Sequence, residues 1–377
     1  MKRKRSIRIL VLMSDAFGGV GGIAKFNRDL LTALCAYPDC TEVVAIPHLM
    51  PTSSGPLPMK LTYVTRGLNG KLRYIAAVFK TVRRNPEFNL VICGHINLLP
   101  IAHLLRFWIQ APILLAIYGI DTWEPTRSRL TNYLVRKIDA FISISELTGQ
   151  RFLSWAKLSG NKGFLLPCTI DLDRFTPGPK NPALLERYDL AGKTVLLTGG
   201  RLAAHERYKG FDEVMELLPA LAKEIPNIAY LIVGDGTDRQ RLEGKTQALG
   251  VAHLVRFAGF ISETEKVEHY RLADVFVMPG RGEGFGIVYL EAMACGVPVV
   301  ASKVDGSREA VRDGALGILV DPNDPEEIKM GIFEALKRPK GVVPEGLDYF
   351  SFENFERRLH RIVDQVLGSN TEGKTKL

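Results

Sequence analysis

The sequence predicts an α/β protein built from two Rossmann-like, doubly wound domains that face one another across a cleft. Its 377 residues exceed what one ordinary hydrophobic core supports. Short apolar segments alternate with longer amphipathic segments along the whole chain, and the pattern occurs twice. The apolar segments are near-continuous runs of Val, Ile and Leu, which is typical of parallel strands covered by helices on both faces.

The apolar segments give the order of the expected strands. In the first half we expect strands at residues 7–13, 43–48, 90–93, 113–118, 140–145 and 164–166. In the second half we expect them at residues 194–198, 229–233, 254–257, 275–278, 297–301 and 317–320. Residues 96–120 are the most apolar stretch, but Pro100, Arg106 and Pro112 interrupt it, so we predict a helix and a buried strand rather than a transmembrane segment.

The boundary between the two domains is expected at residues 167–182, where four prolines, a glycine and two aspartates replace the periodic pattern. We therefore expect an N-terminal domain at 1–170 and a C-terminal domain at 171–350. A charged amphipathic helix is expected at 351–369, packing back toward the N-terminal domain, and a disordered tail at 370–377.

The composition is that of a globular protein with a basic excess. Hydrophobic residues make up 46% and charged residues 24%, which excludes fibrous and wholly disordered classes. The 49 Lys+Arg against 41 Asp+Glu give a formal charge of +8, which favours an anionic partner: nucleic acid, a phosphorylated substrate or a membrane surface. The five cysteines form no CxxC pair, which favours a reducing cytoplasm over a disulfide framework.

The segment 279–298 contains the strongest chemical signal. A strand ends before it, three glycines (Gly282, Gly284 and Gly286) follow, and a helix is expected from about residue 287 to 295. Such a loop lets backbone N–H groups approach an anion at the positive end of a helix. Two glutamates, Glu283 and Glu291, suggest sugar and ribose hydroxyls as additional ligands; the alternative is a glycine-rich turn with two solvated glutamates.

A second cluster, at residues 199–212, also follows a strand and carries Arg201, Arg207 and Lys209. A guanidinium and an ammonium group there could neutralise the charge of a leaving diphosphate without a metal, and the alternative is a solvated basic loop.

Three strand ends in the first half carry further candidates. Glycines 18, 19, 21 and 22 precede an expected helix at 24–34, but they lack the GxGxxG spacing, which disfavours a nicotinamide or flavin enzyme. His95 and Asp121 each follow a strand. No metal-binding pattern and no GxSxG nucleophile motif is present, so we expect no metal and no cofactor.

Several motifs together resemble the retaining glycosyltransferases of family four, also called glycosyl transferases group 1, which have the GT-B fold. They are GRL at 200–202, YKG at 208–210, VGDG at 233–236, ADVFVMP at 273–279, EGFG at 283–286 and EAMACGVP at 291–298. The segment LPCTIDLDRF at 166–175 is similar to the family's hinge, and the resemblance spans nearly the whole chain.

The resemblance implies a role for each candidate. Glu283, Lys209, Arg201 and His95 would be the catalytic residues, and Glu291 would hold the ribose. The residues implied to bind the donor nucleotide-sugar are Gly19, Gly21, Gly22, Arg201, Lys209, Gly234, Asp235, Phe260, Ile261, Glu283, Gly284, Phe285, Gly286, Ile287 and Glu291. The N-terminal domain would be the acceptor side, with Asp121 and Tyr118 near the acceptor.

The function implied is transfer of a sugar, with retention, from a UDP- or GDP-sugar to a glycan or lipid-linked acceptor in cell-surface polysaccharide or glycolipid synthesis. The enzyme would need no metal and no nucleic acid, and would work in the cytoplasm or on the inner face of the cytoplasmic membrane. Two departures concern the sugar and the acceptor: Gly280 stands where the family often has serine, and Tyr118 where it often has histidine. A sugar-nucleotide epimerase of similar fold, or a non-enzymatic protein that binds anionic surfaces, remain alternatives.

A basic amphipathic helix is expected at 71–84. Leu72, Ile75, Phe79 and Val82 follow the spacing of one apolar face, and five basic residues surround it: Lys71, Arg73, Lys80, Arg83 and Arg84. Two interpretations stay open: the helix rests on an anionic membrane, or it packs its apolar face into an ordinary core.

Overall fold

The computed structural model describes residues 6–372, with side chains through residue 368, and divides the chain into two compact α/β units. Unit 1 comprises Met1–Thr169 and Phe352–Leu377, and unit 2 comprises Ile170–Ser351. The breaks predicted from the sequence followed residues 170 and 350. Residues 1–5, four of which are basic, and the last five residues of the expected tail lie outside the described part. No helix within residues 6–372 is long and apolar enough to cross a bilayer.

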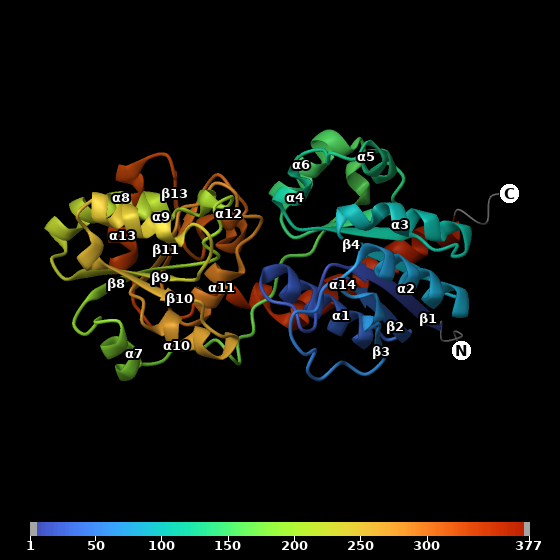
Figure 1. Ribbon diagram of the computed structural model, residues 1–377, viewed down its shortest axis with the longest axis horizontal. Coiled ribbons are helices and arrows are strands. Elements are labelled where there is room, and N and C mark those ends of the chain that lie inside the picture. Colours follow the sequence, from blue (N-terminus) through green and yellow to red (C-terminus); the bar gives the residue numbers. More distant parts are fainter. Residues whose placement is uncertain (1–5, 373–377) are drawn as a thin grey trace. The chain divides into compact units, whose positions relative to one another are not determined.

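Unit 1 is a seven-stranded parallel sheet with the order β3-β2-β1-β4-β5-β6-β7 and helices on both faces (Figure 1). Its strands are β1 (Ile7–Met13), β2 (Cys40–Pro47), β3 (Leu61–Tyr63), β4 (Leu90–Gly94), β5 (Ile113–Ile117), β6 (Ala140–Ser143) and β7 (Gly163–Leu165). Its helices are α1 (Gly22–Ala36), α2 (Lys71–Arg84), α3 (Leu99–Leu104), α4 (Ile120–Trp123), α5 (Arg129–Val135), α6 (Glu146–Ala156) and α14 (Phe352–Glu372).

Unit 2 is a six-stranded parallel sheet with the order β10-β9-β8-β11-β12-β13. Its strands are β8 (Thr194–Gly199), β9 (Ile228–Val233), β10 (Val255–Gly259), β11 (Val275–Met278), β12 (Val299–Ser302) and β13 (Ile318–Val320). Its helices are α7 (Pro182–Arg187), α8 (Phe211–Glu224), α9 (Arg239–Ala248), α10 (Lys266–Arg271), α11 (Ile287–Ala294), α12 (Ser307–Ala310) and α13 (Pro325–Lys337). The two doubly wound parallel sheets confirm the predicted fold class.

The strands form where the apolar runs predicted them because both faces of each sheet are covered. Every residue of β5 and β11 is buried, so no alternation with polar residues is needed. The order of strands reverses between β1 and β4 in unit 1 and between β8 and β11 in unit 2. Ligands of open α/β sheets bind beyond the carboxyl ends of strands at such a reversal.

Helix α14 returns from the end of the chain to unit 1, where it lies beside α1 (Figure 1). Phe355 meets the Phe26 ring edge-on with 5.5 Å between centroids. The Tyr37 hydroxyl donates to Asp364 over 2.5 Å, and a ring nitrogen of His360 lies 2.8 Å from the Ala33 carbonyl oxygen. The helix extends to Glu372, so the first three residues of the expected disordered tail, 370–372, are helical instead.

Two sequence predictions about unit 1 need correction. Strand β3 was not predicted, because it has only three residues, lies at the sheet edge and is partly exposed. In α2 the buried face contains Tyr74, Ala77, Val78 and Val82, whereas Leu72 is 83% exposed. The predicted face was rotated because Tyr74, whose hydroxyl donates to the Ile46 carbonyl over 3.1 Å, was not counted as a core residue. The apolar face of α2 therefore packs in the core, as the second interpretation of this helix required.

Candidate functional site

The loops that follow β8 and β11 meet at the carboxyl edge of the unit 2 sheet. The two strands are neighbours, with Leu196 paired to Val275 and Leu197 to Phe276. Residues 200–210 and 279–286, the two clusters predicted from the sequence, therefore leave the sheet side by side. The loop after β9 joins them, since a Cβ on Gly234 would come within 1.9 Å of the Gly200 carbonyl oxygen. Gly234 thus serves close packing of the two loops.

The contact between the β8 and β11 loops depends on Gly210. This residue has φ +85°, and a Cβ there would lie 2.8 Å from Pro279. A hydrogen bond joins the same two loops next to this contact: the Arg281 N–H donates to the Tyr208 carbonyl over 2.8 Å. Only glycine allows this approach. The consequence is that Lys209, directly before Gly210, lies next to Glu283.

Two cations and two carboxylates alternate in this site, in the order Arg201, Glu206, Lys209 and Glu283. Lys209 Nζ donates to Glu283 Oε2 over 3.1 Å and lies 3.9 Å from Glu206 Oε2. Glu206 also binds Arg201, whose side chain is 76% exposed. Burial by itself would lower the pKa of Lys209, but the carboxylates of Glu283 and Glu206 outweigh it, and the pKa stands above its usual value. Arg201 and Lys209 are therefore held in place by Glu206 and Glu283, and an incoming anion could replace these carboxylates as their partner.

Asp305 holds the Glu283 loop from below. Its Oδ2 accepts the Glu283 N–H over 2.9 Å, and its Oδ1 accepts the Ser307 hydroxyl over 2.6 Å. The Gly306 N–H in turn donates to the Glu283 carbonyl over 2.8 Å. Burial raises the pKa of Asp305. Neither Asp305 nor Glu206 was predicted from the sequence, although Asp305, like the predicted candidates, lies in a loop that directly follows a strand, β12.

Helix α11 begins directly after the loop, at Ile287. Gly286 precedes it with φ +90°, where a Cβ would meet the Tyr289 ring at 2.5 Å. The first N–H groups of a helix have no partner within the helix, so this end can bind an anion. Glu291 lies in the second turn and is only 2% exposed. Its side chain is bonded to Tyr270 and Lys266.

The other residues of unit 2 that were predicted to bind the donor nucleotide-sugar differ in their exposure to solvent. Phe260 is exposed and Ile261 is partly exposed, so both can contact a ligand. The Phe285 side chain is buried against the Phe350 ring, with 5.6 Å between centroids, which leaves its backbone as the available part. The Asp235 carboxylate accepts the Gly236 N–H over 2.8 Å.

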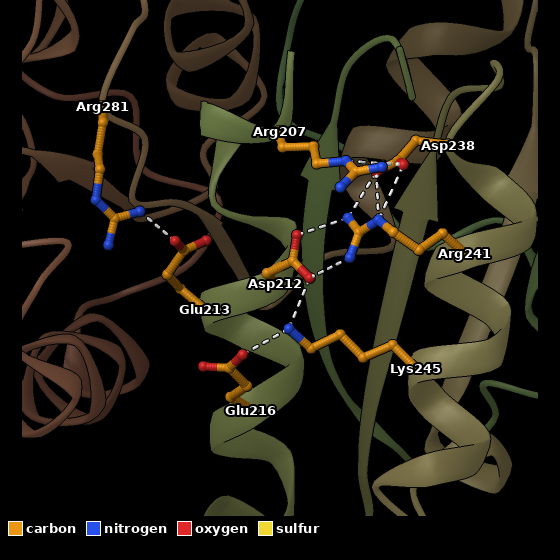
Figure 2. Close-up of polar contacts among 8 residues, drawn as sticks. All are labelled: Arg207, Asp212, Glu213, Glu216, Asp238, Arg241, Lys245 and Arg281. Atoms are coloured by element: carbon orange, nitrogen blue, oxygen red, sulfur yellow. Dashed lines mark hydrogen bonds and ion pairs between the residues drawn. The ribbon is translucent and has the colours of Figure 1, made fainter. Parts of the chain in front are cut away.

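Arg207, the third cation of the predicted cluster, belongs to a separate ion-pair network (Figure 2). Its Nε lies 3.1 Å from Asp238 Oδ1, and Arg241 joins Asp238 to Asp212 through two bonds of 2.7 and 2.8 Å to the latter. Lys245 also binds Asp212, over 2.6 Å. These contacts tie α8 to α9. Arg207 is therefore paired with Asp238, whereas Arg201 and Lys209, the two residues predicted to bind the diphosphate, both lie next to Glu206.

The carboxyl edge of the unit 1 sheet carries a second group of candidates. The glycine loop after β1 is partly exposed, with Gly19 packed on Asp15 and Gly21 (φ +95°) directly before α1, which begins at Gly22. His95 follows the neighbouring strand β4, and its Nδ1 accepts the Asn97 N–H over 3.1 Å. Burial lowers the pKa of His95, so the ring is neutral near pH 7 and its proton lies on Nε2, which can donate to a ligand.

Tyr118 and Asp121 follow β5 and have different surroundings. The Tyr118 side chain is buried, and its hydroxyl donates to Asn27 Oδ1 over 2.7 Å. The expected contact of Tyr118 with an acceptor therefore lacks an exposed hydroxyl. Asp121 is partly exposed, but its Oδ2 is buried without a hydrogen-bond partner, and burial raises its pKa to about 7. Asp121 remains the acceptor-side candidate.

The part of the chain that the structure describes contains no group of three or more His, Cys, Asp or Glu side chains that could hold a metal ion. All five cysteines are free and buried.

The two parallel-sheet units place the protein in the GT-B class. The fold matches HepE of Anabaena, solved with UDP and glucose, with a TM-score of 0.74, 20% identity and coverage of 95% of this chain and 100% of that chain. It also matches sucrose-phosphate synthase from Thermosynechococcus elongatus, with a TM-score of 0.75, 21% identity and coverage of 96% and 100%.

Sequence comparison gives the family. Residues 189–343 match the family described as glycosyl transferases group 1. The chain is 30% identical over 337 residues to phosphatidyl-myo-inositol mannosyltransferase of Mycobacterium leprae, covering 84% of each chain. The chain belongs to the glycosyl transferases group 1 family, and the resemblance inferred from the sequence is confirmed.

Other relatives match over a shorter part. The GDP-mannose-dependent alpha-(1-6)-phosphatidylinositol monomannoside mannosyltransferase of Mycolicibacterium smegmatis is 37% identical over 232 residues, which are 58% of this chain and 59% of that protein. The D-inositol 3-phosphate glycosyltransferase of Geodermatophilus obscurus is 38% identical over 183 residues, 46% of this chain and 40% of that protein. The chain thus spans about half the length of these two relatives.

Proposed function

We propose that the protein is a retaining glycosyltransferase that moves a sugar from a nucleotide-diphosphate sugar to a glycan or lipid-linked acceptor, in cell-surface polysaccharide or glycolipid synthesis. The observation that carries this proposal is the position of Lys209 beside Glu283, at the strand reversal of unit 2 and next to the start of α11. Two anchored cations and a helix N-terminus suit a diphosphate, and two carboxylates suit hydroxyl groups.

In the proposed reaction the diphosphate replaces Glu206 and Glu283 as the partner of Arg201 and Lys209. The carbon–oxygen bond to the diphosphate breaks, and the cations and the α11 N-terminus stabilise the departing charge. The acceptor hydroxyl attacks the same face of the sugar, and its proton passes to the departing diphosphate oxygen. Glu283 and the backbone of residues 284–286 hold the donor sugar, and His95 of unit 1 is proposed as a further catalytic residue, as the family resemblance implies. No protein nucleophile and no metal takes part.

The relatives suggest the substrates. Some are named for GDP-mannose as donor and for phosphatidylinositol mannosides as acceptors, whereas HepE was solved with UDP and UDP-glucose. We therefore propose a UDP- or GDP-sugar as donor, with the nucleobase against Phe260 and Ile261, and a lipid-linked or glycan acceptor near Asp121. The buried, free cysteines support a cytoplasmic location.

A thermal-shift panel of UDP-, GDP- and ADP-sugars tests the donor. A ligand that binds only the folded protein stabilises it by about 2.7 kcal/mol at 100 times its Kd, so we expect one nucleotide to raise the Tm clearly above the others. The matching nucleoside without phosphates serves as control and should leave the Tm unchanged. No shift with any of the sugar nucleotides would contradict the proposal, and turnover of a UDP-sugar without acceptor would favour the epimerase alternative.

We also propose that the exposed side of α2 rests on an anionic membrane surface. Lys80, Arg83 and Arg84 are exposed on this side. The partly buried Phe79 of the same helix meets the Trp108 ring edge-on, with 5.5 Å between centroids. The neighbouring Phe107 is 81% exposed. Aromatic side chains beside cations are suited to the interface of an anionic bilayer, where each cation contributes roughly 1 kcal/mol.

Sedimentation with anionic liposomes tests this surface. We expect wild-type protein to sediment at low salt and less at high salt, because salt screens the attraction. Changing Lys80, Arg83 and Arg84 to Gln should reduce sedimentation, whereas the same change at Lys193, Lys223 and Lys303 of unit 2 should not. Equal binding by wild type and the first variant, or no binding by either, would exclude α2 as the anchor.

A further inference from the structure

The Glu291 carboxylate has two donors already in place on neighbouring elements. The Tyr270 hydroxyl donates to Oε2 over 2.7 Å, and Lys266 Nζ lies 3.3 Å from Oε1. Both partners belong to α10, which packs against α11. Each carboxylate oxygen of Glu291 therefore has its own donor.

Both donors keep their protons. Burial raises the pKa of Tyr270 well above its usual value, and the adjacent Glu291 carboxylate raises it further, so the hydroxyl remains a donor. For Lys266, burial alone would lower the pKa, but Glu291 and Glu263 outweigh it and the pKa is raised. Lys266 Nζ lies 2.8 Å from Glu263 Oε1, so a second carboxylate fixes the ammonium group from the other side.

The number of lone pairs then matters. A carboxylate offers about four acceptor positions, two on each oxygen. Tyr270 uses one on Oε2 and Lys266 uses one on Oε1, which leaves one position on each oxygen. Two adjacent hydroxyl groups, such as O2′ and O3′ of a ribose, present two donors with that spacing. A deoxyribose presents only one of them.

We infer that Lys266 and Tyr270 are positioning residues that orient Glu291 to accept two vicinal hydroxyl groups, so that this triad selects a ribose over a deoxyribose in the donor nucleotide. The inference rests on the proposed function, because it requires a nucleotide at this site. Without Lys266 the carboxylate would keep one donor and could rotate about its side chain, and Oε1 would lose its fixed direction.

Binding of nucleoside diphosphates by calorimetry tests the triad. The probes are UDP with 2′-deoxy-UDP, and GDP with 2′-deoxy-GDP, each titrated into the full chain. For the pair that binds, a hydrogen bond to a charged acceptor corresponds to roughly a 10- to 100-fold preference for the ribose form. We expect Lys266→Met and Tyr270→Phe each to reduce this ratio to a few-fold, mainly by weakening binding of the ribose form, and Lys266→Arg to restore most of it.

Matched variants separate positioning from folding and from general charge. Lys180→Met removes a lysine whose Nζ lies 2.7 Å from the buried Asp274, at the opposite end of β11, and should leave the ratio unchanged. Glu291→Gln should abolish the preference. Should folded Lys266→Met keep the wild-type ratio, or lose affinity equally for both sugars, the inference is wrong and Lys266 acts elsewhere. If wild-type protein binds none of the four probes, the proposed function itself fails.

Discussion

Replacing Lys209 by alanine is expected to lower kcat by about 100- to 1,000-fold, the range seen when one preorganised charge-stabilising donor is removed from an active site. The KM for the donor should change far less. The side chain is 15% exposed and fixed by Glu283 and Glu206, so it is already in place when negative charge grows on the leaving diphosphate. An interaction that strengthens in the transition state appears in kcat rather than in KM.

The neighbouring Arg207 supplies a matched control. Arg207→Ala removes a cation two residues away, but that cation binds Asp238 and should leave kcat within a few-fold of wild type. Steady-state transfer assays with the donor found by thermal shift, run with and without EDTA, measure both effects. Normal turnover by Lys209→Ala at saturating donor would refute its leaving-group role, and strict dependence on added divalent metal would refute the metal-free mechanism.

The second large effect concerns stability and pH. Asp121→Asn is expected to stabilise the protein at pH 8 and to have little effect near pH 4. Burial raises the pKa of Asp121 from 3.8 to about 7, so its carboxyl group loses its proton at a higher pH in the folded protein than in the unfolded chain. A raised pKa contributes stability that is present below the unfolded value and is lost as the pH rises through the folded value. The wild type should lose about 2–4 kcal/mol between pH 4 and pH 7, a loss that asparagine avoids.

Urea unfolding of both proteins at pH 4.5, 6 and 8 measures this difference. Glu124→Gln, an exposed carboxylate three residues away, should show the pH dependence of the wild type. A constant difference between Asp121→Asn and wild type at all three values would show that Asp121 does not titrate in this window. We further expect the stabilised variant to transfer sugar more slowly, since a buried carboxyl oxygen without a partner is retained at a cost in stability.

Much of the fold was predictable because a strand that is buried on both faces of its sheet is an unbroken apolar run in the sequence. Strands such as β1 and β11 were predicted to the residue, since unbroken aliphatic runs bounded by polar residues have few other solutions. The edge strand β3 has no such apolar run, because it pairs with only one neighbour and its side chains are partly or fully exposed. Helix α2 was predicted to the residue, but its buried face was not, since two periodic faces competed and packing chose the one with Tyr74.

The candidate site divides in the same way. By itself the sequence determined the loops: glycines and charged residues that follow strands, in the order of a known family. Only the tertiary structure decided which charges meet. Arg207 and Lys209 are two residues apart, yet one joins Asp238 and the other Glu283, which are 31 and 74 residues away. Asp305 contacts Glu283 and Lys266 contacts Glu291, across 22 and 25 residues of sequence. Strand position is a local property that hydrophobic spacing records, whereas a side-chain partner is set by how separate loops leave the sheet, and no spacing along the chain encodes that choice.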